Sequence, residues 1–207
     1  MSKTHSKTHT LVEGALMIAL STVLSMIQIP LMPHGGSITL LSMLPIILMS
    51  YRHGTRWGLL TAFLNSAIQL LQGIGNLAYC QTLSAQIGCV VWDYLLAFTV
   101  LGLAAQIGSF LPTLTAKAVS GTFSVCVLRY ACSVLSGYIV WKDYDYAFEW
   151  LNNFAWGAWF TTNLGENALC WFYSFVYNAT YMIPETIFTT LGVLLLCRTA
   201  SALFAKQ

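Results

Sequence analysis

Residues 84–108 read SAQIGCVVWDYLLAFTVLGLAAQIG and contain a single charged side chain, Asp93. A transmembrane helix needs about 20 predominantly apolar residues, and this stretch is long enough. The whole chain of 207 residues has the same character, with 57% hydrophobic residues, 8% charged residues and a mean hydropathy of +0.69. Nine Lys/Arg and seven Asp/Glu cannot cover the surface of a soluble domain of this length. The composition therefore predicts an integral membrane protein.

Apolar runs divided by polar segments predict an all-α bundle of six transmembrane helices. The runs lie near residues 11–31, 37–50, 57–74, 84–108, 118–140 and 171–197. We therefore expect one membrane domain over residues 11–198, with short tails at 1–10 and 199–207. The expected outer loops are residues 32–37, 75–83 and 142–170.

The segment between the first two runs contains Pro30, Pro33, Gly35 and Gly36. These residues predict irregular backbone. Irregular backbone near membrane depth is tolerated only where protein or a cavity covers it. This segment is therefore a candidate lid or site loop.

Basic residues indicate which side of the membrane holds the termini. With six spans the termini share a side. Placing them in the cytoplasm puts seven basic residues inside: Lys3, Lys7, Arg52, Arg56, Lys117, Arg198 and Lys206. Lys142 is then alone outside, and Arg129 lies within a span. The positive-inside bias predicts that both termini are cytoplasmic.

Three charged residues, Asp93, Arg129 and Glu185, lie well inside spans and not near their edges. A charge at the bilayer centre costs at least about 2.5–3.5 kcal/mol and needs a partner or a function. Arg129 and Glu185 come out at the same depth on adjacent antiparallel spans when each is counted from the cytoplasmic edge. We expect them to form a structural ion pair. In the alternative interpretation, Arg129 orders polar side chains beneath a ligand.

Asp93 enters its span from the outer side, and no second basic residue is left within the membrane to neutralise it. Such a carboxyl group is either protonated or reserved for a ligand with hydrogen-bond donors or positive charge. Aromatic residues gather at the same end of the spans: Trp92, Tyr94, Trp141, Tyr173 and Tyr177. A carboxylate in an aromatic cage suits a flat cationic ligand. The alternative is a solvated Asp among interfacial aromatic side chains.

Several function classes have no signal in the sequence. A net charge of +2 without a dense basic cluster argues against nucleic acid as a partner. The six cysteines form no CxxC pair, so no metal site is expected. Motifs of hydrolases and ATPases are absent, so we expect neither enzymatic activity nor a cofactor. A small bundle with an outward-facing cage suggests a binding subunit that other proteins energise.

Two further segments have two interpretations each. Ala15 and Ala19, four residues apart on the first span, form a smooth ridge that serves either internal packing or docking of a partner subunit. The connector 142–170 is rich in acidic and aromatic residues. It is either an aromatic belt at the headgroup level or a cover over an outward-facing site.

Four blocks of the sequence resemble one known family. They are GGSITLLSMLPI (35–46), WDYLLAF (92–98), RYACSVLSG (129–137) followed by Trp141, and YSFVYNATYMIPE (173–185). Across residues 11–198 they are similar to the thiamine-binding S-component of energy-coupling factor (ECF) vitamin transporters. The resemblance implies a six-helix protein of the bacterial plasma membrane. Such a protein binds thiamine from outside and docks on a transmembrane coupling protein and two ATPase subunits.

The resemblance also implies roles for individual residues. Asp93 would hydrogen-bond the aminopyrimidine of thiamine, and Trp141 would stack on the ligand. Segment 32–37 would be the gate, and Ala15 and Ala19 would be the docking ridge. The full set of expected substrate-binding residues is Asp93, Trp141, Tyr173, Asn178, Arg129, Ser133, Tyr177 and Tyr79.

Two other hypotheses remain open at this point. Ser133 stands where the family usually carries a ligand-contacting His, so the cargo could instead be a related compound such as a thiamine pyrimidine precursor. A hypothesis from another class is a small membrane enzyme or assembly factor that uses the Arg129 and Glu185 pair.

Overall fold

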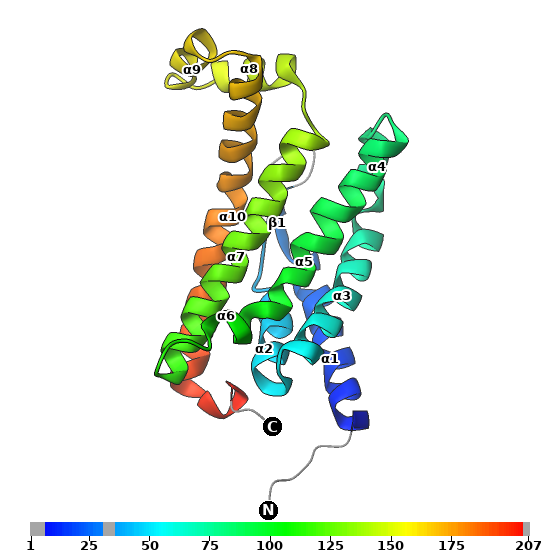
Figure 1. Cartoon of the computed structure of the whole chain (residues 1–207), viewed down its shortest axis with the longest axis vertical. Coiled ribbons are helices and arrows are strands. Elements are labelled where there is room, and N and C mark those ends of the chain that lie inside the picture. The colour runs from blue at the N-terminus through cyan, green and yellow to red at the C-terminus, as the bar shows by residue number, and fades with distance from the viewer. Residues whose placement is uncertain (1–6, 31–35, 205–207) are drawn as a thin grey trace, which may run out of the picture.

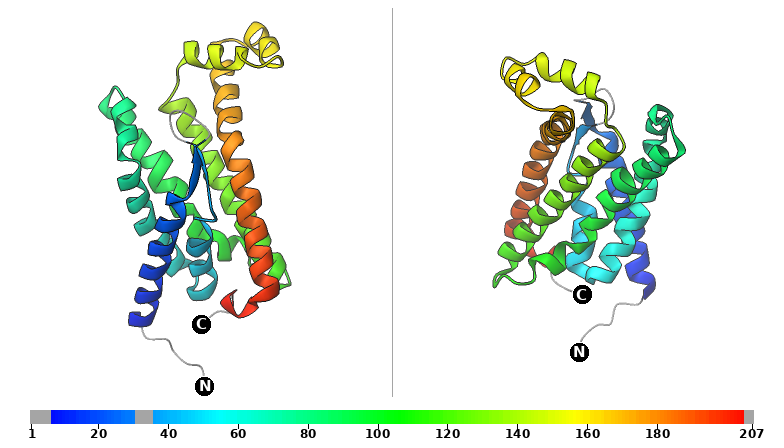
Figure 2. Two further views of the ribbon diagram at one scale, coloured as in Figure 1. Left: turned by 180° about the vertical axis from the view of Figure 1, so that it is seen from behind. Right: turned by 45° about the horizontal axis from the view of Figure 1, so that its top comes forward.

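The computed structural model describes residues 7–30 and 36–204, and most of these residues are helical. The long helices run side by side as a bundle (Figure 1). The first turn of α1 (Lys7–Met26) and the 3₁₀-helix η4 (Ser201–Phe204) lie at one end of the bundle. At the other end, α8 (Tyr144–Asn152) and α9 (Gly157–Asn163) lie across the bundle axis (Figures 1 and 2).

The remaining elements follow the apolar runs. Helices α2 (Leu44–His53), α3 (Thr55–Gln72), α7 (Leu114–Ile139) and α10 (Glu166–Thr199) are regular, and the 3₁₀-helix η1 (Ile74–Tyr79) follows α3. Residues 83–108 form one helical rod with several helix types along it. The rod consists of α4 (Leu83–Cys89), the π-helix η2 (Val90–Leu96), α5 (Ala97–Thr99), the 3₁₀-helix η3 (Val100–Leu103) and α6 (Ala104–Gly108).

Four helices of the described part are long and apolar enough to cross a membrane: α1, the rod 83–108, α7 and α10. They coincide with four of the six expected spans. Helix α3, at the third expected span, is not among them. The second expected span, 37–50, is wrong as a continuous helix, because it contains a strand and only part of α2. The ten residues of α2 measure about 15 Å, half of the hydrocarbon core. The expected count of six crossings is therefore not confirmed.

A two-stranded β-hairpin flanks the segment in which irregular backbone is expected, and residues 31–35 of that segment lie outside the described residues. Strands β1 (Gln28–Pro30) and β2 (Ser37–Thr39) pair antiparallel, with Ile29 opposite Ile38. Proline is tolerated in β1 because an isolated two-stranded ribbon has only edge strands. Most of the predicted gate 32–37 lies outside the described residues; only Gly36 and Ser37 are described.

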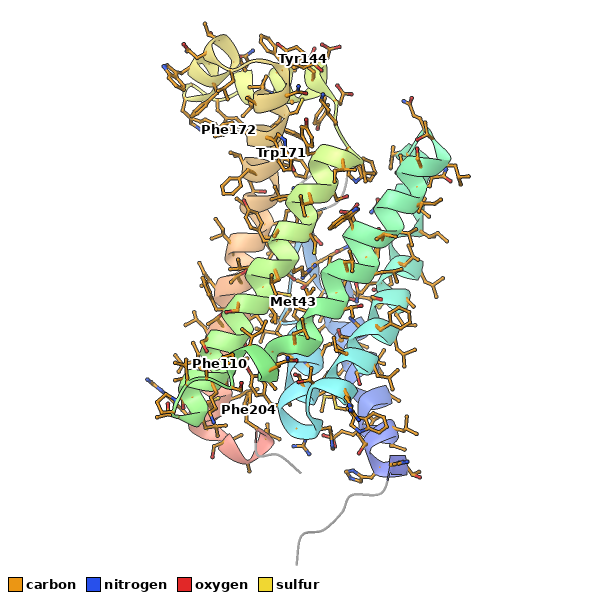
Figure 3. The ribbon with its side chains drawn as sticks, viewed as in Figure 1. Met43, Phe110, Tyr144, Trp171, Phe172 and Phe204 are labelled. Carbon is orange, nitrogen blue, oxygen red and sulfur yellow. The ribbon has the colours of Figure 1, made fainter. Side chains whose placement is uncertain are left out.

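Figure 3 shows how large side chains are distributed along the bundle. Phe110 and Phe204 lie at the end where α1 begins, whereas Tyr144 and Phe172 lie at the end of α8 and α9. Met43, which is 1% exposed, lies in the interior between them. The two ends of the bundle thus differ in structure, and the aromatic connector belongs to one of them.

Glycines allow helix backbones to touch in the half of the bundle away from the connector. A Cβ atom on Gly58 would lie 2.8 Å from the carbonyl oxygen of Gly102. At the same crossing, Ser50 Oγ donates to this oxygen (2.7 Å) and accepts from Ala105 N (3.1 Å). Helices α2, α3 and the rod 83–108 therefore meet at small residues, as membrane helices commonly do.

We expect Gly102→Ala to destabilise the bundle. The added Cβ would lie 2.5 Å from the backbone nitrogen of Leu59, and backbone cannot yield as a flexible side chain can. Overpacking costs about 1–3 kcal/mol, which corresponds to a Tm lower by about 3–10 °C in a fluorescence melt of the detergent-solubilised protein. Gly75→Ala is the matched control, because nothing lies within 4 Å of its Cβ position. Equal Tm values for the two variants would contradict the close crossing.

Candidate ligand-binding site

A cavity of about 880 Å³ lies between the helices, toward the end that carries α8. Its volume is in the range of about 300–1,000 Å³ that small-molecule sites occupy. The β-hairpin, the ends of α1 and α3, η1, the rod 83–108, α7, α8 and α10 all contribute to its wall. All eight residues expected to bind substrate line this cavity: Asp93, Trp141, Tyr173, Asn178, Arg129, Ser133, Tyr177 and Tyr79.

Asp93 lies on the π-helix η2 of the rod. Its Oδ2 accepts a hydrogen bond from Nε1 of Trp141 on α7, at 2.9 Å. Within the described ranges, Asp93 forms no ion pair with a Lys, Arg or His side chain. The carboxylate therefore has an uncharged donor as its partner and remains the open acid of the cavity wall.

The π-helical geometry around Asp93 could not be predicted from the sequence. Single π-turns inside α-helices are rare and occur frequently at functional sites. Neither the composition nor the spacing of residues 90–96 signals the change of helix type. The apolar run predicted the helix correctly, but which residues of it face the cavity could not be derived.

The expected aromatic cage forms with one exception. Tyr173 and Tyr177 of α10 have ring centroids 5.4 Å apart and line the cavity together with Trp141. Tyr94 also lines it, and its hydroxyl donates to the carbonyl oxygen of Gly73 at 3.0 Å. Trp92, expected beside Asp93 in the cage, is not part of the cavity wall. Of the two sequence neighbours of Asp93 on η2, it is Tyr94 that shares the cavity wall with it.

The connector contributes residues to the site that the sequence did not single out. Tyr146 of α8 lines the cavity, and its ring is 6.0 Å from that of Tyr173. The ring centroid of Trp150 lies 5.4 Å from that of Tyr173 and 6.1 Å from that of Tyr177. Tyr146 and Trp150 are four residues apart, a spacing that puts both on one helix face. This spacing in the sequence could have indicated that the two residues act together. It does so only if the connector is predicted to be helical, and no such prediction followed from the sequence.

Other aromatic residues of the connector point away from the cavity. Trp156 is 45% exposed and Trp159 62% exposed. Phe154 and Trp156 stack with ring centroids 5.2 Å apart. Both interpretations of the connector therefore have residues that fit them: one part folds against the cavity, and another presents aromatic surface of the kind found at membrane interfaces.

Asn178 is buried, and most of its hydrogen-bonding capacity is used within the bundle. Its Nδ2 donates to the carbonyl oxygens of Ser174 (2.8 Å) and Ser133 (3.3 Å). Its Oδ1 accepts from the hydroxyl of Tyr181 at 2.6 Å. Asn178 thus ties α10 to α7 at the cavity wall and positions Tyr181, which also lines the cavity.

Arg129 and Glu185 lie together deep in the bundle. The distance from Arg129 Nη1 to Glu185 Oε2 is 3.3 Å, and the Glu185 side chain is 1% exposed. The hydroxyl of Thr39 on β2 donates to the other oxygen of Glu185. Arg129 also lies 4.3 Å from the ring centroid of Phe98 and lines the cavity. The expected ion pair is therefore present, and it stands at the floor of the cavity, which Arg129 lines.

The two alanines of the predicted ridge lie away from the cavity. Ala15 and Ala19 are exposed on α1, whereas the neighbouring Gly14 is buried. A Cβ on Gly14 would lie 3.2 Å from Oγ1 of Thr61. Internal packing of α1 thus uses Gly14, and the alanine ridge faces outward.

Comparisons with known proteins agree over almost the whole chain. Residues 11–205 match the family model described as thiamine transporter protein (Thia_YuaJ). The chain is 30% identical over 208 residues to the thiamine transporter ThiT of Bacillus subtilis (strain 168), covering 95% of this chain and 94% of that protein. Its fold is similar to the solved structure of ThiT from Listeria monocytogenes, with a TM-score of 0.68, 22% identity and coverage of 96% of this chain and 98% of that one. The chain therefore belongs to the thiamine transporter protein family.

Proposed function

We propose that this chain is the substrate-binding S-component of an ECF-type transporter and captures thiamine at the outer face of the bacterial plasma membrane. Family membership supports thiamine as the cargo. The cavity lies toward the end of the bundle opposite the start of α1 and η4. With the termini in the cytoplasm, as the distribution of basic residues predicts, the cavity faces outward.

Asp93 is the observation that carries this proposal. A carboxylate within a membrane bundle is costly unless it has a partner. In the described part of the chain, its hydrogen-bond partners are the indole N–H of Trp141 and the side chains of Ser136 and Cys89, none of which is a cation. Thiamine supplies what is missing, because its aminopyrimidine has donors and its thiazolium carries a positive charge. Hydrogen bonds to a charged acceptor are about twice as strong as neutral ones.

The bond between Trp141 and Asp93 also has a geometric effect. It fixes the indole ring relative to the carboxylate, so a ligand can stack on an aromatic face while its donors reach Asp93. Tyr173 and Tyr177 add two further aromatic rings to the cavity wall, and both contact Trp150 of α8. A cation between such rings gains cation–π attraction. The chain binds and releases its cargo and makes or breaks no bond in it.

Transport needs energy that this chain does not supply, because its sequence contains no Walker A motif. The exposed ridge of Ala15 and Ala19 is the surface we assign to the transmembrane coupling protein, through which two ATPase subunits would act. Segment 32–37 would close over the bound ligand, since the hairpin arms on either side of it line the cavity.

We expect Asp93→Asn to weaken thiamine binding by about 10- to 100-fold, the worth of a hydrogen bond to a charged group. Asn keeps the size of the side chain and an acceptor for Trp141 but removes the charge. Binding is measured by quenching of tryptophan fluorescence in detergent. Glu149→Gln, an exposed carboxylate of α8 outside the cavity, is the control and should leave the affinity unchanged. Identical binding curves for wild type and Asp93→Asn would remove Asp93 from the site.

The second candidate cargo is a thiamine pyrimidine precursor, favoured by Ser133, which lines the cavity where the family usually has a His. Competition between thiamine and 4-amino-5-hydroxymethyl-2-methylpyrimidine distinguishes the two. We expect thiamine to bind at least about tenfold more tightly, roughly 1.4 kcal/mol, because only thiamine brings a cation to the aromatic wall. A preference of that size for the pyrimidine would make the precursor the cargo.

We expect Ala15→Trp and Ala19→Trp to abolish copurification with ATPase subunits, because a bulky side chain prevents close helix approach. Thiamine binding should stay within about twofold of wild type, since neither residue lines the cavity. Ala131→Trp, at an exposed alanine of α7, is the matched control and should retain the ATPases. Full retention of the ATPases by both ridge variants would contradict docking through this ridge.

A further inference from the structure

Helix α8 of the connector forms part of the cavity wall as a firmly packed element. Asp143 and Tyr146 line the cavity. Farther along the same helix, Ala147 and Leu151 have no exposed surface. A Cβ on Gly157 would lie 1.8 Å from the carbonyl oxygen of Leu151, so the turn between α8 and α9 is also tightly packed. The position of Asp143 is therefore determined by packed structure.

Asp143 is an exposed carboxylate at the cavity mouth, and no cation of the described chain is paired with it. It is the N-cap of α8, and its Oδ1 accepts from the backbone nitrogen of Tyr146 at 3.0 Å. The adjacent Lys142 turns to α10 instead. Its Nζ lies 2.7 Å from Oδ1 of Asn167 and 3.3 Å from Oε1 of Glu166.

The charges around the cavity are unequal in sign. Asp93 and Asp143 are acidic wall residues, and Arg129 is the single Lys or Arg among the described lining residues. The guanidinium of Arg129 is already paired with the buried carboxylate of Glu185. This arrangement of charges favours a cationic ligand. An anionic group at the mouth would be repelled by the carboxylate of Asp143.

Among the residues that the structure describes, the mouth also lacks the devices by which proteins hold phosphate. Phosphate groups are bound by free Arg forks or by unoccupied N–H groups at helix N-termini. The N-terminus of α8 opens on the mouth, but the carboxylate of Asp143 already caps it. A phosphate ester would therefore meet a like charge at Asp143 and a helix N-terminus that is already capped.

We infer that Asp143 makes the site selective for the free, cationic thiazolium alcohol over its phosphate esters. This inference rests on the proposed thiamine binding and deepens it. With the aminopyrimidine at Asp93, the hydroxyethyl group is the end of the ligand farthest from that carboxylate. The inference places this end toward the mouth, where phosphorylation would put up to two negative charges near Asp143.

The test compares equilibrium binding of thiamine and thiamine monophosphate to wild type, Asp143→Asn and Asp145→Asn. Asn is as good an N-cap as Asp, so α8 keeps its start. Asp145 is the matched control, because it is an exposed carboxylate of the same helix that lines a separate surface hollow with Tyr144, Phe148 and Glu149. Both variants change the net charge equally, and only one changes the cavity mouth.

We expect wild type to bind the monophosphate at least about tenfold more weakly than thiamine. The ratio of the Kd for the monophosphate to the Kd for thiamine should fall by about threefold or more in Asp143→Asn at low salt. The change should fade at about 0.5 M salt, because Asp143 is exposed and its field is screened. Asp145→Asn should leave the ratio unchanged.

Three outcomes would overturn the inference alone: a wild-type ratio near one, a ratio unaffected by Asp143→Asn, or equal changes in both variants, which would indicate a general effect of surface charge. Failure of wild type to bind thiamine at all would instead overturn the proposed function, and the inference with it.

Discussion

The buried carboxylate of Glu185 is the constraint on which the rest of the structure depends. It is 1% exposed and accepts from Arg129 on α7 and from Thr39 on β2. Removing one partner of such a buried pair leaves an uncompensated charge, at a cost of about 3–5 kcal/mol. Helices α7 and α10 and the hairpin are therefore held in one arrangement, and that arrangement defines the cavity floor.

The two acids within the bundle illustrate opposite uses of charge in an apolar environment. Glu185 is neutralised by a fixed cation and contributes to structure. Asp93 is hydrogen-bonded by uncharged side chains, among them the indole N–H of Trp141 at 2.9 Å, and it stands in a wall that also contains aromatic rings. Because the cation that would balance Asp93 is not part of the described protein, its balance can come from a ligand. In the proposed function, Glu185 thus holds the elements of the site together and Asp93 recognises the cargo.

The sequence predicted those parts that depend on composition and on charge count. Apolar runs located α1, the rod 83–108, α7 and α10 within a few residues, and counting along the spans brought Arg129 and Glu185 together. Local pattern could not distinguish a strand from a short helical span at residues 37–50, because an apolar run of that length suits both. The contributions of Asp143 and Tyr146 were missed for another reason. They depend on tertiary packing of α8 against α10, which aromatic composition alone does not specify.

The π-helix η2 has a consequence for how this site can change over evolutionary time. A π-turn accommodates one residue more than an α-turn, so it behaves as a single-residue insertion absorbed without a loop. Removing that residue would restore the α-helical register. The part of the rod before η2 would then rotate by about 100° about the helix axis relative to the part after it. The outer half of the rod, which includes Asp93, would then turn while the glycine crossing at Gly102 stayed in place. One insertion or deletion here could thus exchange the side chain offered to a cargo without disturbing the helix contacts that maintain the bundle.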